Sequence, residues 1–119
     1  MEKMKKIKRP VNSHKAYHAH VYYEKEKLAF ATALCESVGE RFNLEIGRIH
    51  QKLVGPHPRW SCQILFGSKD FDALIPWLET NREGLSILVH GQTGNDLLGH
   101  TENAYWLGDS IELNLSIFK

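Results

Sequence analysis

Histidine is the residue type in this sequence whose number and spacing suggest chemistry. The chain has seven histidines, against two cysteines and two methionines. His18 and His20 form a His-x-His pair, and His57 stands between two prolines in the string GPHP. Neutral imidazole is the commonest protein ligand for metals, and a site needs three or four ligands within about 2.0 to 2.2 Å of the ion. These histidines therefore indicate a metal site if the fold brings several of them together.

The segments around these histidines have the periodicities of strands and amphipathic helices. Strict alternation and β-favouring residues mark the strands, and apolar residues spaced three and four apart mark the helices. Pro76 lies in the second helical segment, where it is tolerated only near the first turn or at a kink. The pattern predicts, in chain order, a strand at 16–23, a helix at 24–42, strands at 44–54 and 60–66, a helix that Ser68 or Asp70 can cap and that Gly84 ends, a strand at 85–90 and a final strand at 111–118.

This order of elements predicts an α+β fold of the ferredoxin-like βαββαβ type, with an antiparallel sheet and an extra C-terminal strand. Residues 1–13, with five Lys or Arg among the first nine, are expected to form a flexible basic arm, and residues 14–119 a single domain. Both helices of such a fold pack on one face of the sheet. The other face must be covered by a partner, by a ligand or by the C-terminal segment from residue 91 onward, called here the tail. A homodimer is therefore expected.

The alternation within strands predicts where the histidines point. In the first strand the small and apolar residues should face the helices, which leaves His18, His20 and Tyr22 on the open face. The same test sends His90 outward at the end of the fourth strand, and His57 continues the outward series of the third. The first strand lies between the third and fourth in a ferredoxin-like sheet. Four imidazoles are therefore expected to converge on one surface, as a metal site requires.

The remaining chemically capable residues allow more than one interpretation. His100, in the string DLLGHTENA, could be a metal ligand, an acid/base group or a surface residue. Arg59, or with less support Arg48, could bind a substrate carboxylate through two parallel hydrogen bonds. His14 and His50 are assigned to the arm and to an outer strand, with no role in the site.

Composition excludes several classes of protein. A chain of 119 residues can hold one core without disulfides, and 42% hydrophobic with 24% charged residues is typical of globular domains. Fifteen Lys and Arg against fourteen Asp and Glu argue against a nucleic-acid partner. No apolar run approaches the ~20 residues that span a bilayer, so a cytoplasmic protein without a membrane partner is expected. Cys35 and Cys62 lack CxxC spacing and are expected to be buried, reduced thiols.

Four strings of the sequence, in their order along the chain, resemble the DOPA 4,5-dioxygenase family. They are AYHAHVYY, VGPHPRWSCQILF, PWLETNREGLSILVH and QTGNDLLGHTENAYWLG, and the similarity runs from about Tyr17 to Phe118. The resemblance implies extradiol ring cleavage of a small, DOPA-like catechol by dioxygen and non-haem Fe(II), on a ferredoxin-like dimer. Zinc or another divalent metal can occupy such a site in a purified sample.

The resemblance also assigns roles to individual histidines. The family's pattern falls on His20, His57 and His90, which are the expected metal ligands. It falls as well on His100, which precedes a threonine in the string HT. His18 is expected beside the ligands, and with His100 it is a candidate for the acid/base group of the reaction, a role typically worth 10²–10⁴-fold in rate.

Two positions depart from the family's pattern. The family commonly has proline after the LVH histidine and aspartate before the HT histidine, where this chain has Gly91 and Gly99. Many non-haem iron oxygenases use two histidines and one carboxylate. The carboxylates available for that pattern are Asp96 and Glu102, in the segment around the HT string.

Two functions of different kinds therefore compete. As a dioxygenase, the protein would bind a catechol next to the metal, and Tyr22 and Arg59 are the expected substrate contacts. As a non-catalytic dimeric module, it would bind a metal or a small aromatic compound without turnover, and a closed four-histidine site would hold zinc and ignore a catechol. An RNA-binding sheet has less support, because histidines occupy positions where stacking aromatics would be needed.

Overall fold

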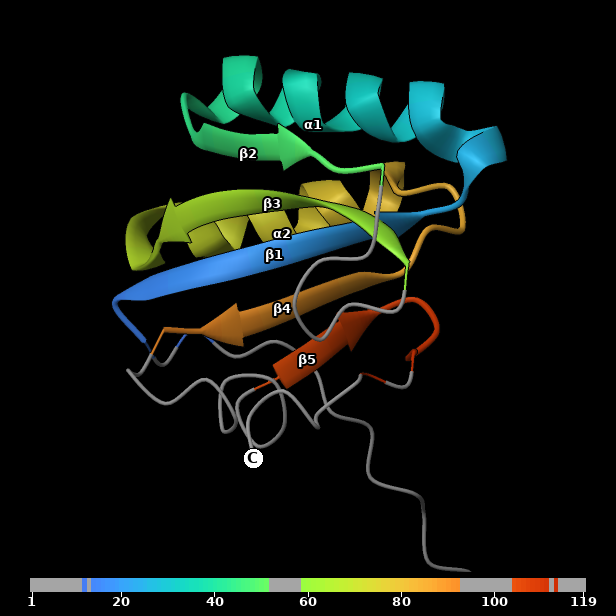
Figure 1. The fold of residues 1–119 in the computed structure, drawn as a ribbon. Helices are drawn as coiled ribbons and strands as arrows, with labels where there is room; N and C mark the ends of the chain where they lie inside the picture. Colours follow the sequence, from blue (N-terminus) through green and yellow to red (C-terminus); the bar gives the residue numbers. More distant parts are fainter. Residues whose placement is uncertain (1–11, 13, 52–58, 93–103, 112, 114–119) are drawn as a thin grey trace, which may run out of the picture.

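The computed structural model describes residues 12, 14–51, 59–92, 104–111 and 113 of the chain. The described strands form one antiparallel sheet in the order β2-β3-β1-β4-β5, and both helices lie against the same face of it (Figure 1). In chain order the elements are β1 (Ala16–Tyr23), the 3-10 turn η1 (Lys25–Lys27), α1 (Leu28–Phe42), β2 (Glu45–Ile49), β3 (Trp60–Gly67), α2 (Ser68–Asn81), β4 (Ile87–Gly91) and β5 (Ala104–Leu107).

The first four strands and the two helices have the predicted ferredoxin-like order, with β1 between β3 and β4. The extra strand is present but not where the pattern placed it. It is formed by Ala104–Leu107, which pairs with β4, whereas Ile111 and Leu113 belong to no strand and the rest of 111–118 lies outside the described residues. A four-residue strand is too short to show a period, and the free edge of β4 selects it through backbone hydrogen bonds.

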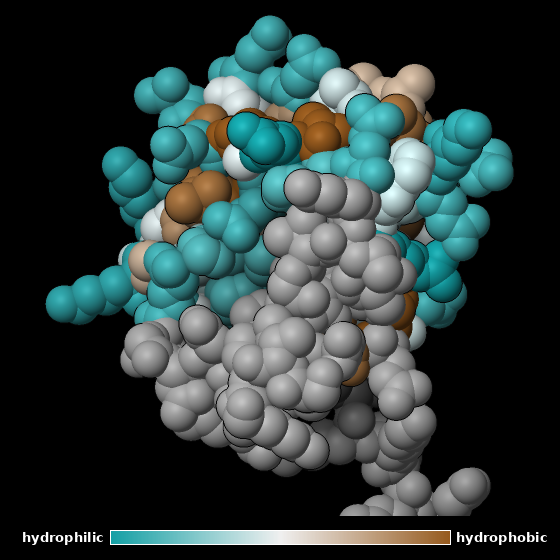
Figure 2. Space-filling view, in the orientation of Figure 1, coloured by the Kyte–Doolittle hydropathy of each residue, from teal (hydrophilic) through white to brown (hydrophobic). Residues whose placement is uncertain are grey.

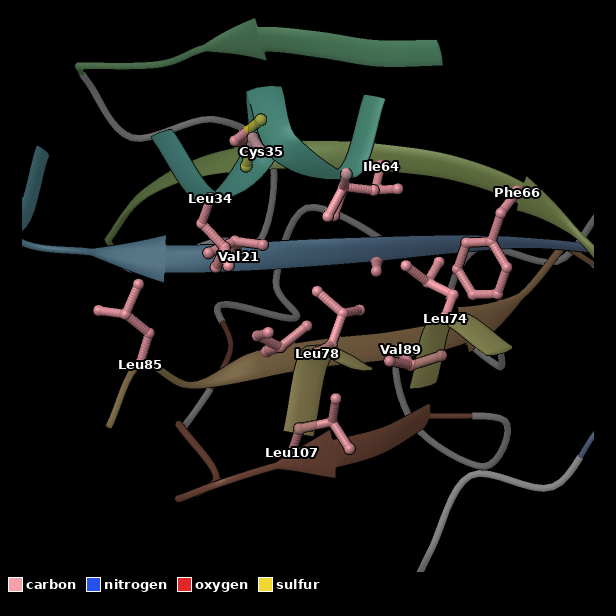
Figure 3. Close-up of a cluster of buried hydrophobic side chains, with 14 of the residues drawn as sticks. Val21, Leu34, Cys35, Ile64, Phe66, Leu74, Leu78, Leu85, Val89 and Leu107 are labelled. Atoms are coloured by element: carbon pink, nitrogen blue, oxygen red, sulfur yellow. The ribbon is translucent and has the colours of Figure 1, made fainter. Parts of the chain in front are cut away.

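The alternation of β1 builds the core between the sheet and the helices. Tyr17, Ala19, Val21 and Tyr23 are at most 2% exposed and face α1 and α2, as predicted. Figure 3 shows the leucines of the two helices pointing toward the central strands. The side chains labelled there that complete this core are Leu34, Cys35, Ile64, Phe66, Leu74, Leu78, Leu85, Val89 and Leu107.

The second helix differs in detail from the sequence prediction. Gly67 is its N-cap and no side chain caps it, so neither Ser68 nor Asp70 has the predicted capping role. Both lie inside the first turn, where the Asp70 carboxylate still favours the helix dipole. Pro76 lies well past the first turn, yet the helix continues to Asn81. Pro76 is exposed, so water can reach the carbonyl that loses its hydrogen bond to the missing N–H.

The face of the sheet away from the helices, called here the outer face, is partly covered by the chain itself. Tyr22, Leu88 and Ala104 are buried on it, and Ile111 and Leu113 pack against them together with Trp106. Of the three covers expected for this face, the tail is therefore in place, and the homodimer stays a prediction. Figure 2 shows mainly hydrophilic side chains on the described surface in that view. Neither described helix has the length and apolarity to span a bilayer.

Candidate metal centre

Two neighbouring strands bring three histidines together on the outer face. β1 carries His18 and His20, and β4 carries His90 directly opposite His18. Residues two apart on a strand share a face, and opposed residues of an antiparallel pair have Cβ atoms about 4.5 to 5.5 Å apart. One ligand atom from each of the three imidazoles lies within 4.8 Å of the other two. The pairing of β1 with β4 thus assembles this histidine cluster.

The rings of the cluster are in close contact and largely buried. Nε2 of His20 lies 2.9 Å from Nε2 of His90, and the two ring planes are within 15° of parallel with centroids 5.0 Å apart. His18 stands edge-on to both rings, with centroids 6.0 Å from His20 and 5.3 Å from His90. His20 and His90 are each 5% exposed, whereas His18 is half-buried. One side of the cluster is therefore more accessible than the other.

The hydrogen bonds of His90 indicate how its ring is oriented. Nδ1 of His90 lies 3.3 Å from the carbonyl oxygen of Gly91, which can act only as a hydrogen-bond acceptor. In the tautomer that carries its proton on Nδ1, His90 presents a lone pair at Nε2, which can accept a hydrogen bond from the Nε2–H of His20. A backbone carbonyl bound to the far nitrogen is the usual way in which proteins orient a metal-binding histidine. A metal ion would take the place of the proton that His20 and His90 share.

The cluster fits a divalent transition metal. Two nitrogens held about 2.1 Å from one ion are about 3.0 Å apart at a right angle and about 3.4 Å apart at the tetrahedral angle. The two Nε2 atoms, 2.9 Å apart, are close enough for one ion to bind both. Within the described residues, the group holds imidazoles and no carboxylate. Neutral imidazole suits zinc, iron and copper, and so the three histidines do not determine which of these metals binds.

Two of the three predicted ligands, His20 and His90, lie in the cluster. The third, His57, and the acid/base candidate His100 lie outside the described residues, as do the reserve carboxylates at 96 and 102. His18, expected beside the metal, contributes a ligand atom to the group and is therefore a candidate third ligand. The His-x-His spacing already indicated that His18 could be a ligand together with His20, since residues two apart on a strand share a face.

The two predicted substrate contacts, Tyr22 and Arg59, line one cavity of about 650 Å³ next to the end of β1. Arg59 forms an ion pair there with the exposed carboxylate of Glu24. The Tyr22 ring stacks on Trp106 with centroids 5.7 Å apart. Burial raises the pKa of the Tyr22 phenol, which therefore stays protonated at neutral pH and can donate a hydrogen bond. The roles of Tyr22 and Arg59 in binding a substrate stay predictions.

The cysteines agree with their prediction. Cys35 and Cys62 are buried, free thiols that meet between α1 and β3. The hydrogen bond with the Cys62 thiol and burial raise the pKa of Cys35, so this thiol stays protonated and unreactive. His50 lies away from the cluster, and its backbone N–H donates to the carbonyl of Ser61.

Comparison with known proteins places the chain in a family. Residues 17–117 match the model of the Dopa 4,5-dioxygenase family. The chain belongs to this family. The resemblance that the four strings indicated is thereby confirmed over nearly the whole chain, and the three clustered histidines all fall within the matched range.

Proteins similar to this chain come from Botryotinia fuckeliana, Amanita muscaria and Nostoc punctiforme. The chain is 36% identical to an uncharacterized 21.2 kDa protein of Botryotinia fuckeliana and covers 63% of it. It is 32% identical to the DOPA 4,5-dioxygenase of Amanita muscaria and covers 49% of it; the two matches use 87% and 86% of this chain. This chain thus spans about half to two thirds of these fungal relatives.

A crystal structure supports the fold. A candidate dioxygenase from Nostoc punctiforme superimposes with a TM-score of 0.82 at 40% sequence identity. The match covers 86% of this chain and 89% of that one. The ferredoxin-like architecture with two helices on one face of the sheet is therefore shared with a solved protein of similar length.

Proposed function

We propose that this protein is a dioxygenase that opens the ring of a small, DOPA-like catechol in the extradiol manner, with Fe(II) held by the histidine cluster. The observation that carries the proposal is the cluster itself: a largely buried group of His18, His20 and His90, in a chain of the Dopa 4,5-dioxygenase family. The relative from Amanita muscaria is named for that activity, which supports the choice of substrate class.

The residues of the site have separate tasks in this proposal. His20 and His90 would bind the metal through Nε2, and their burial excludes competing water from that side. An Fe(II) ion held there would supply the redox chemistry for the reaction of the diol with dioxygen and would bring the two reactants together. His18 either completes the ligand set or accepts a proton that the diol loses. Tyr22, protonated at neutral pH, can donate a hydrogen bond to the bound substrate.

The test is anaerobic reconstitution with Fe(II), followed by addition of DOPA and a small panel of catechols in the presence of dioxygen. We expect dioxygen uptake and a product heavier than the catechol by one dioxygen. His20→Ala should abolish both, whereas the matched variant His50→Ala, outside the cluster, should retain them. Bound iron without uptake would contradict the proposal and favour the alternative of a metal- or aromatic-binding module without turnover.

A further inference from the structure

Gln63 of β3 is a polar residue beside the histidine cluster. It has no role in the reaction proposed above. In the pairing of β1 with β3, Gln63 lies directly opposite His20, and Leu65 lies directly opposite His18. Opposed residues of an antiparallel pair share a face, with Cβ atoms about 4.5 to 5.5 Å apart. Cys62 and Ile64, on either side of Gln63, belong to the core beneath the helices. Gln63 therefore stands on the outer face beside His20.

The exposure of the outer face shows from which side a ligand can approach the cluster. Toward β4 and β5, Leu88 is 0% and Ala104 6% exposed, and the tail packs over them. Toward β3, His18, Gln63 and Leu65 are each half-buried. The accessible side of the cluster is thus the one that β3 borders. A flat ring that reached the histidines from there would lie over Leu65 and beside Gln63.

The Gln63 side chain is available for such a ligand. Its carboxamide forms no hydrogen bond with any other residue that the structure describes, although it is half-buried next to His20. A carboxamide offers two N–H donors and one carbonyl acceptor, and those of Gln63 are not among the buried, unpaired polar atoms of the described residues, so they remain accessible to a ligand. Gly47 of β2 lies close to Gln63 on its other side: a Cβ at Gly47 would lie 3.3 Å from both the Cβ and the carbonyl oxygen of Gln63, so the glycine avoids crowding there.

We infer that Gln63 binds the diol of the catechol, through a hydrogen bond from its carboxamide N–H to one of the two hydroxyl oxygens, while the ring packs over Leu65. The inference rests on the proposed function, because it takes a catechol as the ligand of the cluster. A carboxamide suits this position, since it donates to an oxygen that has lost its proton and adds no charge beside the imidazoles. Gln63 is thus a binding residue for one of the two hydroxyls that define the substrate class.

The experiment measures binding without turnover. Zinc-loaded protein is titrated with 4-nitrocatechol, whose absorbance reports binding, and zinc affinity is measured separately by competition with a chelator. Gln63→Met keeps the length of the side chain and removes its hydrogen bonds. We expect the Kd for 4-nitrocatechol to rise about tenfold, the usual effect of one lost hydrogen bond to an oxygen that carries charge. Zinc affinity should be unchanged. The matched control Gln51→Met, exposed beyond the end of β2, should change neither quantity.

A second variant keeps the test independent of packing. Gln63→Glu preserves the shape and places a negative charge next to the catecholate, so binding should weaken by more than in Gln63→Met. Equal Kd values for the wild type and both variants would overturn the role of Gln63 and leave the proposed function standing. Weaker zinc binding in Gln63→Met would also overturn it, because Gln63 would then act through His20. A zinc-loaded wild type that binds no 4-nitrocatechol would overturn the proposed function itself.

Discussion

The two faces of β1 are both largely covered, yet different interactions stabilise them. The inner face presents Ala19 and Val21 to a core formed by aliphatic and aromatic side chains. The outer face presents His18 and His20 to a third imidazole on β4. An apolar side chain gains free energy from burial without needing a specific neighbour, at about 25 cal/mol per Å². A buried imidazole must find a hydrogen-bond partner or a metal, because an unsatisfied polar group costs about 1 to 3 kcal/mol.

The difference shows how one strand can stabilise the fold with one face and carry the candidate metal ligands on the other. On the inner face any well-shaped apolar partner serves, so stability is spread over many residues. On the outer face the partners are specific atoms, Nε2 of His20 and Nε2 of His90, at 2.9 Å. Changes on the inner face should therefore alter stability and spare metal binding, and changes to the histidines of the outer face should chiefly reduce metal binding.

The largest effect is expected on the inner face. Leu78 of α2 is 0% exposed in the core. Leu78→Ala should lower the free energy of unfolding by about 2 to 5 kcal/mol, because it removes buried methyl groups and leaves a cavity. Urea unfolding measures this loss. Thr80→Ala, exposed on the same helix, should stay within about 0.5 kcal/mol of the wild type. The two faces would not be separable if the folded Leu78 variant lost metal affinity as well.

The matching change on the outer face is His90→Ala. It should reduce zinc affinity by more than about 100-fold, since loss of a group that merely orients a ligand already costs 10- to 100-fold. The free energy of unfolding of the metal-free protein should change by only about 1 to 3 kcal/mol, the cost of an unpaired His20 nitrogen. Chelator competition gives the affinity, with His50→Ala as control. Unchanged affinity in His90→Ala would exclude the cluster as the metal site.

Alkaline pH should lower the free energy of unfolding through one buried tyrosine on each face of β1. Burial raises the pKa of Tyr22 on the outer face and of Tyr23 on the inner face. Above the ordinary tyrosine pKa of about 10, the unfolded chain loses these protons while the folded protein keeps them, so stability falls as pH rises. The slope should approach about 1.4 kcal/mol per pH unit for each phenol.

Single variants separate the two tyrosines. Tyr22→Phe and Tyr23→Phe should each remove one phenol's share of the alkaline slope in urea unfolding measured from pH 8 to pH 11. Tyr23→Phe should also lower stability at neutral pH by about 1 kcal/mol, because the Tyr23 hydroxyl donates to the carbonyl of His50 at 2.7 Å. A slope that stays the same in both variants would show that other groups cause the alkaline loss.

The smallest effect is expected at the rim of the cavity. Arg59 and Glu24 form an ion pair with side chains 42% and 66% exposed. Exposed pairs contribute at most about 1 kcal/mol and weaken with salt, so Glu24→Gln should hardly change the melting temperature. If Arg59 binds a substrate carboxylate, its release from Glu24 should instead tighten binding of a catechol that carries one. A melting temperature that drops by as much as in Leu78→Ala would contradict this view of the rim.

Much of the site could be read from strand periodicity alone. Alternation places His18, His20 and Tyr22 on one face of β1 and His90 on the same face of β4, and the structure agrees. The assignment of His18 to a place beside the metal came from the resemblance, whereas its spacing already allowed it as a ligand. Alternation along 60–66 also places Gln63 on the outward face, but it does not place it beside His20, because alternation gives the face of a side chain and not its cross-strand partner.

Local patterns along the sequence determined the two helices, the first four strands and the faces of β1, because the period of two in a strand and of 3.6 in a helix is a property of neighbouring residues. Only the tertiary structure decided that His90 lies opposite His18, that Gln63 lies opposite His20, and that Ala104–Leu107 completes the sheet. Register and edge pairing are contacts between residues far apart in the chain, and they depend on packing that no single segment specifies.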